Sequence, residues 1–103
     1  MKDFSFVEEQ RIGGSRYFTL TGIVHINGAA FMEGILGKAV KDGCDHIIIN
    51  MSLVSLFSSA AIRVVLSVYK KMRHCGGTLQ IENPSENVRN VIGMTALDAM
   101  LLI

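Results

Sequence analysis

The sequence predicts an α/β protein with a mixed, mostly parallel β-sheet and helices packed against it. Short runs of β-branched and apolar residues alternate along the chain with helical patterns, and turn residues separate them. Half of the 103 residues are hydrophobic, which is enough for one buried core. Helices that regularly separate buried strands indicate crossover connections and parallel strand pairs. We therefore expect a single domain over residues 1–103.

The first half of the chain predicts a hairpin followed by a helix. Residues 4–7 alternate weakly between apolar and polar, and residues 16–24 are rich in β-branched and aromatic side chains. Asn27 is the expected N-cap of a helix over residues 29–40. Gly43 suits the left-handed position after that helix.

The second half predicts more alternating elements. We expect, in order, a buried strand over 45–51, a helix over 59–73, a strand over 78–82, a helix capped by Asn83 and ended by Gly93, and a last short strand over 97–103. The helix over 59–73 should bury one face, formed by Ile62, Val65, Leu66, Tyr69 and Met72.

Composition and charge exclude several classes of function. The formal net charge is +1, and the basic residues form no run, so we expect no nucleic-acid partner. No segment approaches the roughly 20 apolar residues that span a bilayer, and the N-terminus lacks the pattern of a signal peptide. We therefore expect no membrane insertion and a cytoplasmic location. Cys44 and Cys75 are then expected as reduced thiols.

Catalytic and metal-binding patterns are absent from the sequence. Cys44, His46, His74 and Cys75 lack the spacing of a metal site such as Cys-x-x-Cys. There is no Ser/His/Asp order, no carboxylate pair and no phosphate-loop glycine pattern. We therefore predict no enzyme activity, no metal and no cofactor.

The most informative point is Ser58-Ser59, which lies between a buried strand and a helical pattern. Serine is favoured at a helix start because its hydroxyl accepts from the free backbone N–H groups of the first turn. The same position would tolerate an added phosphate at the positive end of the helix dipole. Residue type alone favours a simple cap, so the choice between a cap and a switch stays open at this stage.

Several motifs together resemble the STAS domain family, typified by bacterial anti-sigma factor antagonists. They are a buried strand followed by Phe57-Ser58-Ser59-Ala60-Ala61-Ile62, Gly76-Gly77 before the next strand, Leu20-Thr21-Gly22 before the first helix, and Met94-Thr95-Ala96-Leu97-Asp98 near the end. Each motif is short, but their order covers nearly the whole chain. The resemblance implies a STAS-like fold and a regulatory protein-binding module.

The resemblance also implies a partner and a modified residue. In the family, a serine kinase that is itself an anti-sigma factor phosphorylates the first serine of the pair, here Ser58. The unmodified protein binds this kinase, phosphorylation breaks the contact, and a matching phosphatase restores it. A weak homodimer stays open. The expected contact surface consists of Phe57, Ser58, Ser59, Ile62 and Arg63, with Phe57 exposed because the family has a polar residue there.

The sequence departs from the family pattern around this site. Phe57 replaces the usual aspartate, Ala60 and Ala61 replace a segment that includes glycine, and Asn50 replaces an acidic residue. Two other functions therefore stay open. One is an unphosphorylated accessory or scaffold subunit, for example of a transporter ATPase or a signalling complex. The other is a small-ligand module that holds a phosphate or nucleotide at the helix start.

Overall fold

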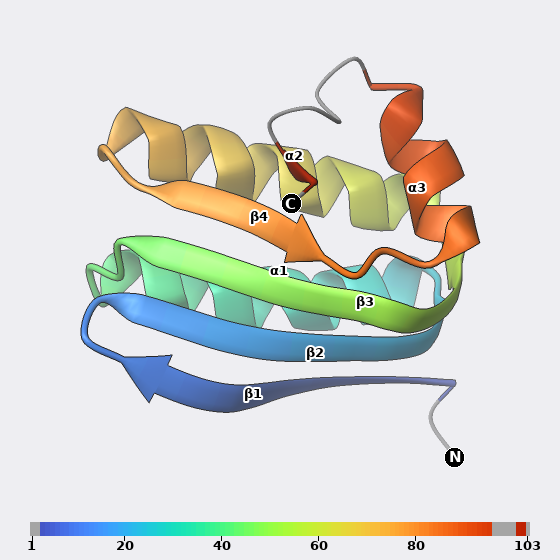
Figure 1. Ribbon diagram of the computed structural model, residues 1–103, viewed down its shortest axis with the longest axis horizontal. Helices are drawn as coiled ribbons and strands as arrows, with labels where there is room; N and C mark the ends of the chain where they lie inside the picture. The colour runs from blue at the N-terminus through green and yellow to red at the C-terminus, as the bar shows by residue number, and fades with distance from the viewer. Residues whose placement is uncertain (1–2, 96–100, 103) are drawn as a thin grey trace.

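The computed structural model describes residues 3–95 and 101–102, which form a four-stranded sheet and three helices (Figure 1). The elements are, in chain order, β1 (Phe4–Ile12), β2 (Ser15–Val24), α1 (Ile26–Lys41), β3 (His46–Phe57), α2 (Ser59–His74), β4 (Thr78–Glu82) and α3 (Glu86–Gly93). Their types and their order agree with the sequence prediction.

The sheet has the order β1-β2-β3-β4 and is mixed. Strands β1 and β2 form an antiparallel hairpin, whereas β2 with β3 and β3 with β4 pair in parallel. Helices α1 and α2 make the two parallel crossovers, pack against each other and lie on the same face of the sheet (Figure 1). The predicted mixed, mostly parallel sheet with helices packed against it is confirmed.

The core lies between the sheet and these two helices. Along β2, Phe18, Leu20 and Val24 point into it, and apolar side chains of β3 and β4 continue it. The buried face of α2 differs from the prediction. It is formed by Ala61, Val64, Val65, Val68, Tyr69 and Met72, whereas Ile62 and Leu66 are only half-buried. Small and β-branched side chains, Ala61, Val64 and Val68, therefore belong to the buried face of α2, which packs against α1.

Two predicted helix caps are wrong. Helix α1 begins at Ile26 after His25, whose side chain makes no capping hydrogen bond, so Asn27 lies inside the first turn. Helix α3 is capped by Ser85, whose Oγ accepts from the backbone N–H of Val88 (3.2 Å). Asn83 instead occupies the left-handed region (φ 48°) at the end of β4, which turns the chain toward α3.

Strand β3 runs well past its partner β4. The pairing of β3 with β4 ends at Asn50 and Glu82, so the last seven residues of β3 have no strand on that side. The chain leading into α3 covers this edge. The Ser85 N–H donates to the Met51 carbonyl oxygen (3.1 Å), and the Phe57 N–H donates to Asn87 Oδ1 (2.8 Å). The predicted strand over 45–51 is therefore too short.

The predicted last strand over 97–103 lies mostly outside the described residues. Leu101 is buried, and Leu102 forms an isolated parallel bridge with Ile81 of β4.

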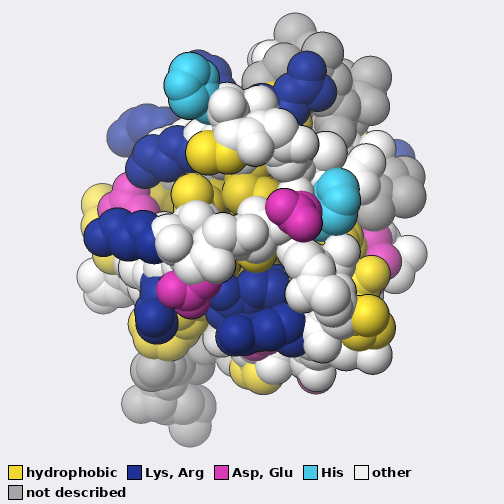
Figure 2. All heavy atoms as spheres, turned by 90° about the vertical axis from the view of Figure 1, so that its left-hand side faces the viewer, with side chains coloured by type: hydrophobic (Ala, Val, Ile, Leu, Met, Phe, Trp, Pro, Cys, Tyr) yellow, Lys and Arg dark blue, Asp and Glu magenta, His cyan; other side chains and the backbone are white. Residues whose placement is uncertain are grey.

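Lysine and arginine side chains gather at the end of the molecule where α1 and α2 finish (Figure 2). The last turn of α1 carries Lys38 and Lys41, and the last turn of α2 carries Lys71, Arg73 and His74. Cations there compensate the negative ends of the helix dipoles. The helices therefore start at one end of the molecule, and the basic end is the opposite one.

Candidate functional site

The candidate site lies at the edge of the sheet where β2 and β3 end and α1 and α2 begin. Val24 and Phe57 are paired in the β2–β3 register and are the last residues of their strands. Because the carboxyl ends of parallel strands meet at one edge, the connections to the two helices lie side by side. This position places Ser58 opposite the start of α1.

Ser58 is the N-cap of α2. It has an extended backbone (φ −72°, ψ 166°), and its Oγ accepts from the N–H of Ala61 (3.2 Å). The Ser58 N–H donates to the Val24 carbonyl oxygen (3.0 Å), and the Ile62 N–H donates to the Ser58 carbonyl oxygen (3.0 Å). The backbone at Ser58 is therefore held on both sides, while its side chain is half-buried and not sealed in the core.

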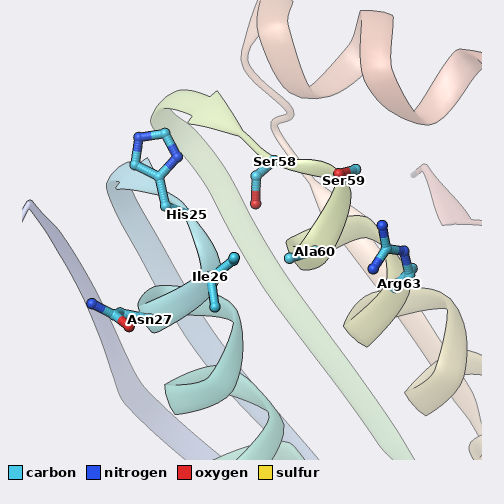
Figure 3. A pocket seen from close by; sticks show the side chains of 7 residues that line it. All are labelled: His25, Ile26, Asn27, Ser58, Ser59, Ala60 and Arg63. Atoms are coloured by element: carbon cyan, nitrogen blue, oxygen red, sulfur yellow. The ribbon is translucent and has the colours of Figure 1, made fainter.

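A surface pocket of about 620 Å³ opens between the starts of α1 and α2 (Figure 3). The Ser58 hydroxyl points into the space between the two helices. The pocket is lined by His25, Ile26, Asn27, Ser58, Ser59, Ala60 and Arg63. These residues come from the two strand-to-helix connections and the first turns that follow them. A macromolecular partner can therefore reach the Ser58 hydroxyl from solvent.

The electrostatics of this pocket favour negative charge. Neither α1 nor α2 has an acidic residue in its first turn, and the lining contains none. Both helices direct the positive ends of their dipoles toward the pocket, and Arg63 is exposed about one turn inside α2. The arrangement can therefore accommodate a negatively charged group on Ser58.

The structure changes the expected contact surface at Phe57. Its side chain is only 3% exposed, so the expectation of an exposed Phe57 is wrong. The β2–β3 register shifts twice, between Thr19 and Thr21 and between Gly22 and Ile23. These irregularities change which residues of β3 face inward, and Phe57 ends beside Val24, which is fully buried.

The other predicted contact residues differ in their access to solvent. Ser59 and Arg63 are exposed, and Ile62 is half-buried against the core. All three lie at the start of α2 with Ser58, so the structure brings four of the five predicted residues together without Phe57. The role of these residues in partner binding stays a prediction.

Exposed apolar side chains near Ser58 were missed by the sequence interpretation. Ile26, the first residue of α1, is 73% exposed and lines the same pocket as Ser58. Ile23 and Phe31 line an adjoining pocket of about 380 Å³, which shares His25 and Asn27 with the first pocket. The predicted topology could have indicated Ile26. It follows β2, which is parallel to the strand that precedes Ser58, so both residues lie at the same edge of the sheet.

The cysteines and the other potential metal ligands among the described residues form no second candidate site. Cys44 and Cys75 are free, and burial raises the pKa of the Cys44 thiol, which keeps it protonated. Within residues 3–95 and 101–102, no group of three His, Cys, Asp or Glu side chains is placed to hold a metal ion. Among the helices described here, none is long and apolar enough to cross a membrane.

This fold is that of a STAS domain. The sequence profile of the STAS domain matches residues 8–103, and the chain belongs to that family. One relative is BtrV of Bordetella bronchiseptica, which is named for a proposed role as an anti-sigma factor antagonist. It is 31% identical over 81 residues, which cover 79% of this chain and 70% of BtrV.

Two solved structures of SpoIIAA have the same fold. The anti-sigma factor antagonist SpoIIAA in its unphosphorylated form superposes with a TM-score of 0.86 at 21% identity, covering 96% of this chain and 86% of SpoIIAA. The phosphorylated form of SpoIIAA, a Bacillus cell fate determinant, gives a TM-score of 0.82 at 20% identity, with 96% and 89% covered. At these identities the likeness establishes the fold, and the relatives support a general role among anti-sigma factor antagonists.

Proposed function

We propose that this protein is an anti-sigma factor antagonist of the cytoplasm that binds a serine-kinase anti-sigma factor and is switched by phosphorylation of Ser58. The observation that carries the proposal is the solvent-open Ser58 hydroxyl at the start of α2. The relatives named as anti-sigma factor antagonists support the choice of partner. In this proposal the protein acts by binding and not as an enzyme.

In the unmodified state, the pocket edge is the contact surface. Ser58, Ser59 and Arg63 contribute polar groups, and Ile26 contributes an exposed apolar side chain beside them. An apolar side chain surrounded by polar groups is a typical anchor at protein interfaces. Binding of the kinase to this surface would release the sigma factor that the kinase holds.

Phosphorylation would change the charge of this surface without unfolding the domain. The Ser58 oxygen attacks the γ-phosphorus of ATP. The Oγ–P bond forms as the bond between the γ-phosphorus and the ADP oxygen breaks, ADP leaves, and a base of the kinase takes the hydroxyl proton. The product carries about −1.5 to −2 charges at neutral pH. The free N–H groups of the first turn and the α2 dipole stabilise that charge, and Arg63 lies near enough along the helix to contribute.

The charged product would then prevent binding of the kinase. A partner surface that packs on Ile26 and the unmodified Ser58 would have to remove the phosphate from water and find room for it, which is costly. A phosphatase would hydrolyse the phosphoserine and restore the contact surface. This cycle requires no conformational change in the sheet.

The test is phosphorylation by anti-sigma kinases encoded in the same genome. The protein is incubated with each kinase and ATP, and its intact mass is measured. We expect one phosphoryl group on the wild type and on Ser59→Ala, and none on Ser58→Ala. Because Ser58→Ala also removes a helix cap worth about 1 kcal/mol, its folding is checked by circular dichroism. A phosphoryl group that persists in Ser58→Ala, or is absent from the wild type with every kinase, contradicts the proposal.

A further inference from the structure

A side chain of α3 binds the backbone directly beside Ser58. Strand β3 extends past β4, so the N–H of Phe57 has no neighbouring strand to accept it on that side. Asn87 supplies the acceptor through its side-chain Oδ1, at 2.8 Å. The contact joins residues 30 positions apart and is partly buried. It is therefore a tertiary contact between α3 and the β3–α2 junction.

The two hydrogen bonds at this junction have different origins. The Ser58 N–H is held by the Val24 carbonyl oxygen (3.0 Å), which belongs to the sheet. The Phe57 N–H is held by Asn87, which belongs to α3. Helix α3 is itself anchored in the core by Val88 and Ile92, which are fully buried. Helix α3, which lies outside the sheet, thus holds the Leu56–Phe57 peptide, one residue before the serine that we propose is phosphorylated.

We infer that Asn87 is a positioning residue for Ser58, so that α3 sets how the hydroxyl is presented to the kinase. The inference rests on the proposed function and adds to it a residue outside the contact surface. Reaction rates depend strongly on the placement of the reacting atom, and an error of about 1 Å costs on the order of 10²-fold. Loss of the Asn87 contact frees the Leu56–Phe57 peptide, which adjoins the Phe57–Ser58 peptide held by Val24, while Ser59, Arg63 and Ile26 keep their places.

Three variants test this inference. Asn87→Ala removes the acceptor, and Asn87→Asp restores an oxygen acceptor on a side chain of the same length. Asn90→Ala is the matched control, because it makes the same change at an exposed position of the same helix. Backbone amide hydrogen exchange, followed by NMR, reports on the junction without any kinase. The kinetics of Ser58 phosphorylation, measured with the kinase that the mass assay identifies, report on how the Ser58 hydroxyl is placed for the kinase.

We expect Asn87→Ala to speed amide exchange at Phe57 by about 10-fold or more, because the Phe57 N–H loses its acceptor, with the core strand residue Ile49 unchanged. The kcat of phosphorylation should fall by about 10-fold or more with KM changed by less than about 2-fold, because the contact surface stays intact. Asn87→Asp should restore both values toward those of the wild type, and Asn90→Ala should alter neither.

Two results would overturn the inference. One is amide exchange at Phe57 in Asn87→Ala that is no faster than in Asn90→Ala. The other is an unchanged kcat in Asn87→Ala, with the wild type phosphorylated normally. If no kinase modifies wild-type Ser58, the proposed function fails and the inference fails with it. The mass assay on the wild type therefore separates the failure of the proposed function from the failure of the positioning role alone.

Discussion

At the residue scale, the Ser58 hydroxyl combines a structural and a proposed regulatory role. As an N-cap it accepts from the Ala61 N–H, and as a phosphorylation site it would carry its new charge toward the same N–H groups. A phosphate oxygen can accept where the hydroxyl oxygen does now. The two roles are therefore compatible, and a domain that changes its surface charge at this position can remain folded in both states.

A second residue-scale feature is the ion pair between Glu8 and Arg16. Arg16 Nη2 and Nε donate to the two oxygens of Glu8 at 2.8 and 3.0 Å, and the Arg16 side chain is only 8% exposed. Hydrogen bonds from Arg16, and then from Arg11, lower the pKa of Glu8 from 4.5 to about 2. A lowered folded-state pKa means that the stabilisation is complete above about pH 4.5 and is lost as the pH falls toward 2.

We therefore expect Glu8→Gln to remove this acid-dependent part of the stability. At pH 7 the variant should lose about 1–3 kcal/mol of unfolding free energy, since the buried Arg16 loses the carboxylate that accepts its hydrogen bonds and keeps the longer ion pair with Asp42 (3.5 Å). The wild type and the variant should converge in stability as the pH approaches 2. Urea unfolding between pH 2 and 7 measures both. Glu9→Gln, an exposed neighbour, is the control. A constant difference between wild type and Glu8→Gln at all these pH values would contradict the assignment.

Residue-scale details were the least predictable from the sequence. Ser58 at a helix start was predictable because the apolar period changes there, and local capping chemistry follows from residue type. The burial of Phe57 was not, because it depends on register shifts between β2 and β3 that no local pattern encodes. Asn87 was also missed, since its partner is the backbone N–H of a residue 30 positions away.

At the element scale, type and order were predictable, whereas lengths were not. The periods of apolar residues distinguish strands from helices, and this signal is local. The length of β3 depends on α3, which covers the edge that β4 leaves open and so allows the strand to continue to Phe57. The order of short motifs along the chain predicted membership of the STAS domain family, and the sequence profile confirms it.

Helix α1 offers a prediction about its glycines. A Cβ added at Gly34 or Gly37 would meet no atom within 4 Å. Alanine in a helix interior is favoured over glycine by about 0.5–1 kcal/mol, so Gly34→Ala and Gly37→Ala should each raise the unfolding free energy by about that amount. Thermal or urea unfolding measures the gain.

Gly28 gives the matched control in the same helix. A Cβ there would lie 3.0 Å from Val24 Cγ1 and 3.3 Å from Phe4 Cδ1, so these neighbours would have to move. We expect Gly28→Ala to be destabilising or to give no gain. If Gly28→Ala raised the unfolding free energy as much as Gly34→Ala does, the close contacts with Val24 and Phe4 would not explain the glycine at position 28.

At the scale of the whole molecule, the fold separates two ends with different chemistry. The end where α1 and α2 start carries Ser58, the two adjoining pockets and exposed apolar side chains. The opposite end carries the basic last turns of both helices (Figure 2). It also carries the start of β2, where Arg16 pairs with Glu8. Parallel strands joined by right-handed crossovers require this polarity, because every helix on that face must start at the same edge. The location of the site therefore follows from the topology and needs no single motif.

This polarity predicts which apolar side chains contact the partner. Ile26 beside Ser58 is 73% exposed, and Ile12 at the opposite end of the sheet is 56% exposed. Neither is part of the core, so aspartate at either position should change the unfolding free energy by less than about 0.5 kcal/mol.

Ile26→Asp should weaken binding to the anti-sigma kinase by about 10-fold or more, because it removes an apolar anchor and adds a charge at the interface. Ile12→Asp should leave the affinity unchanged. Calorimetric titration of the kinase with each variant measures the effect, and equal affinities would place the contact surface away from the start of α1.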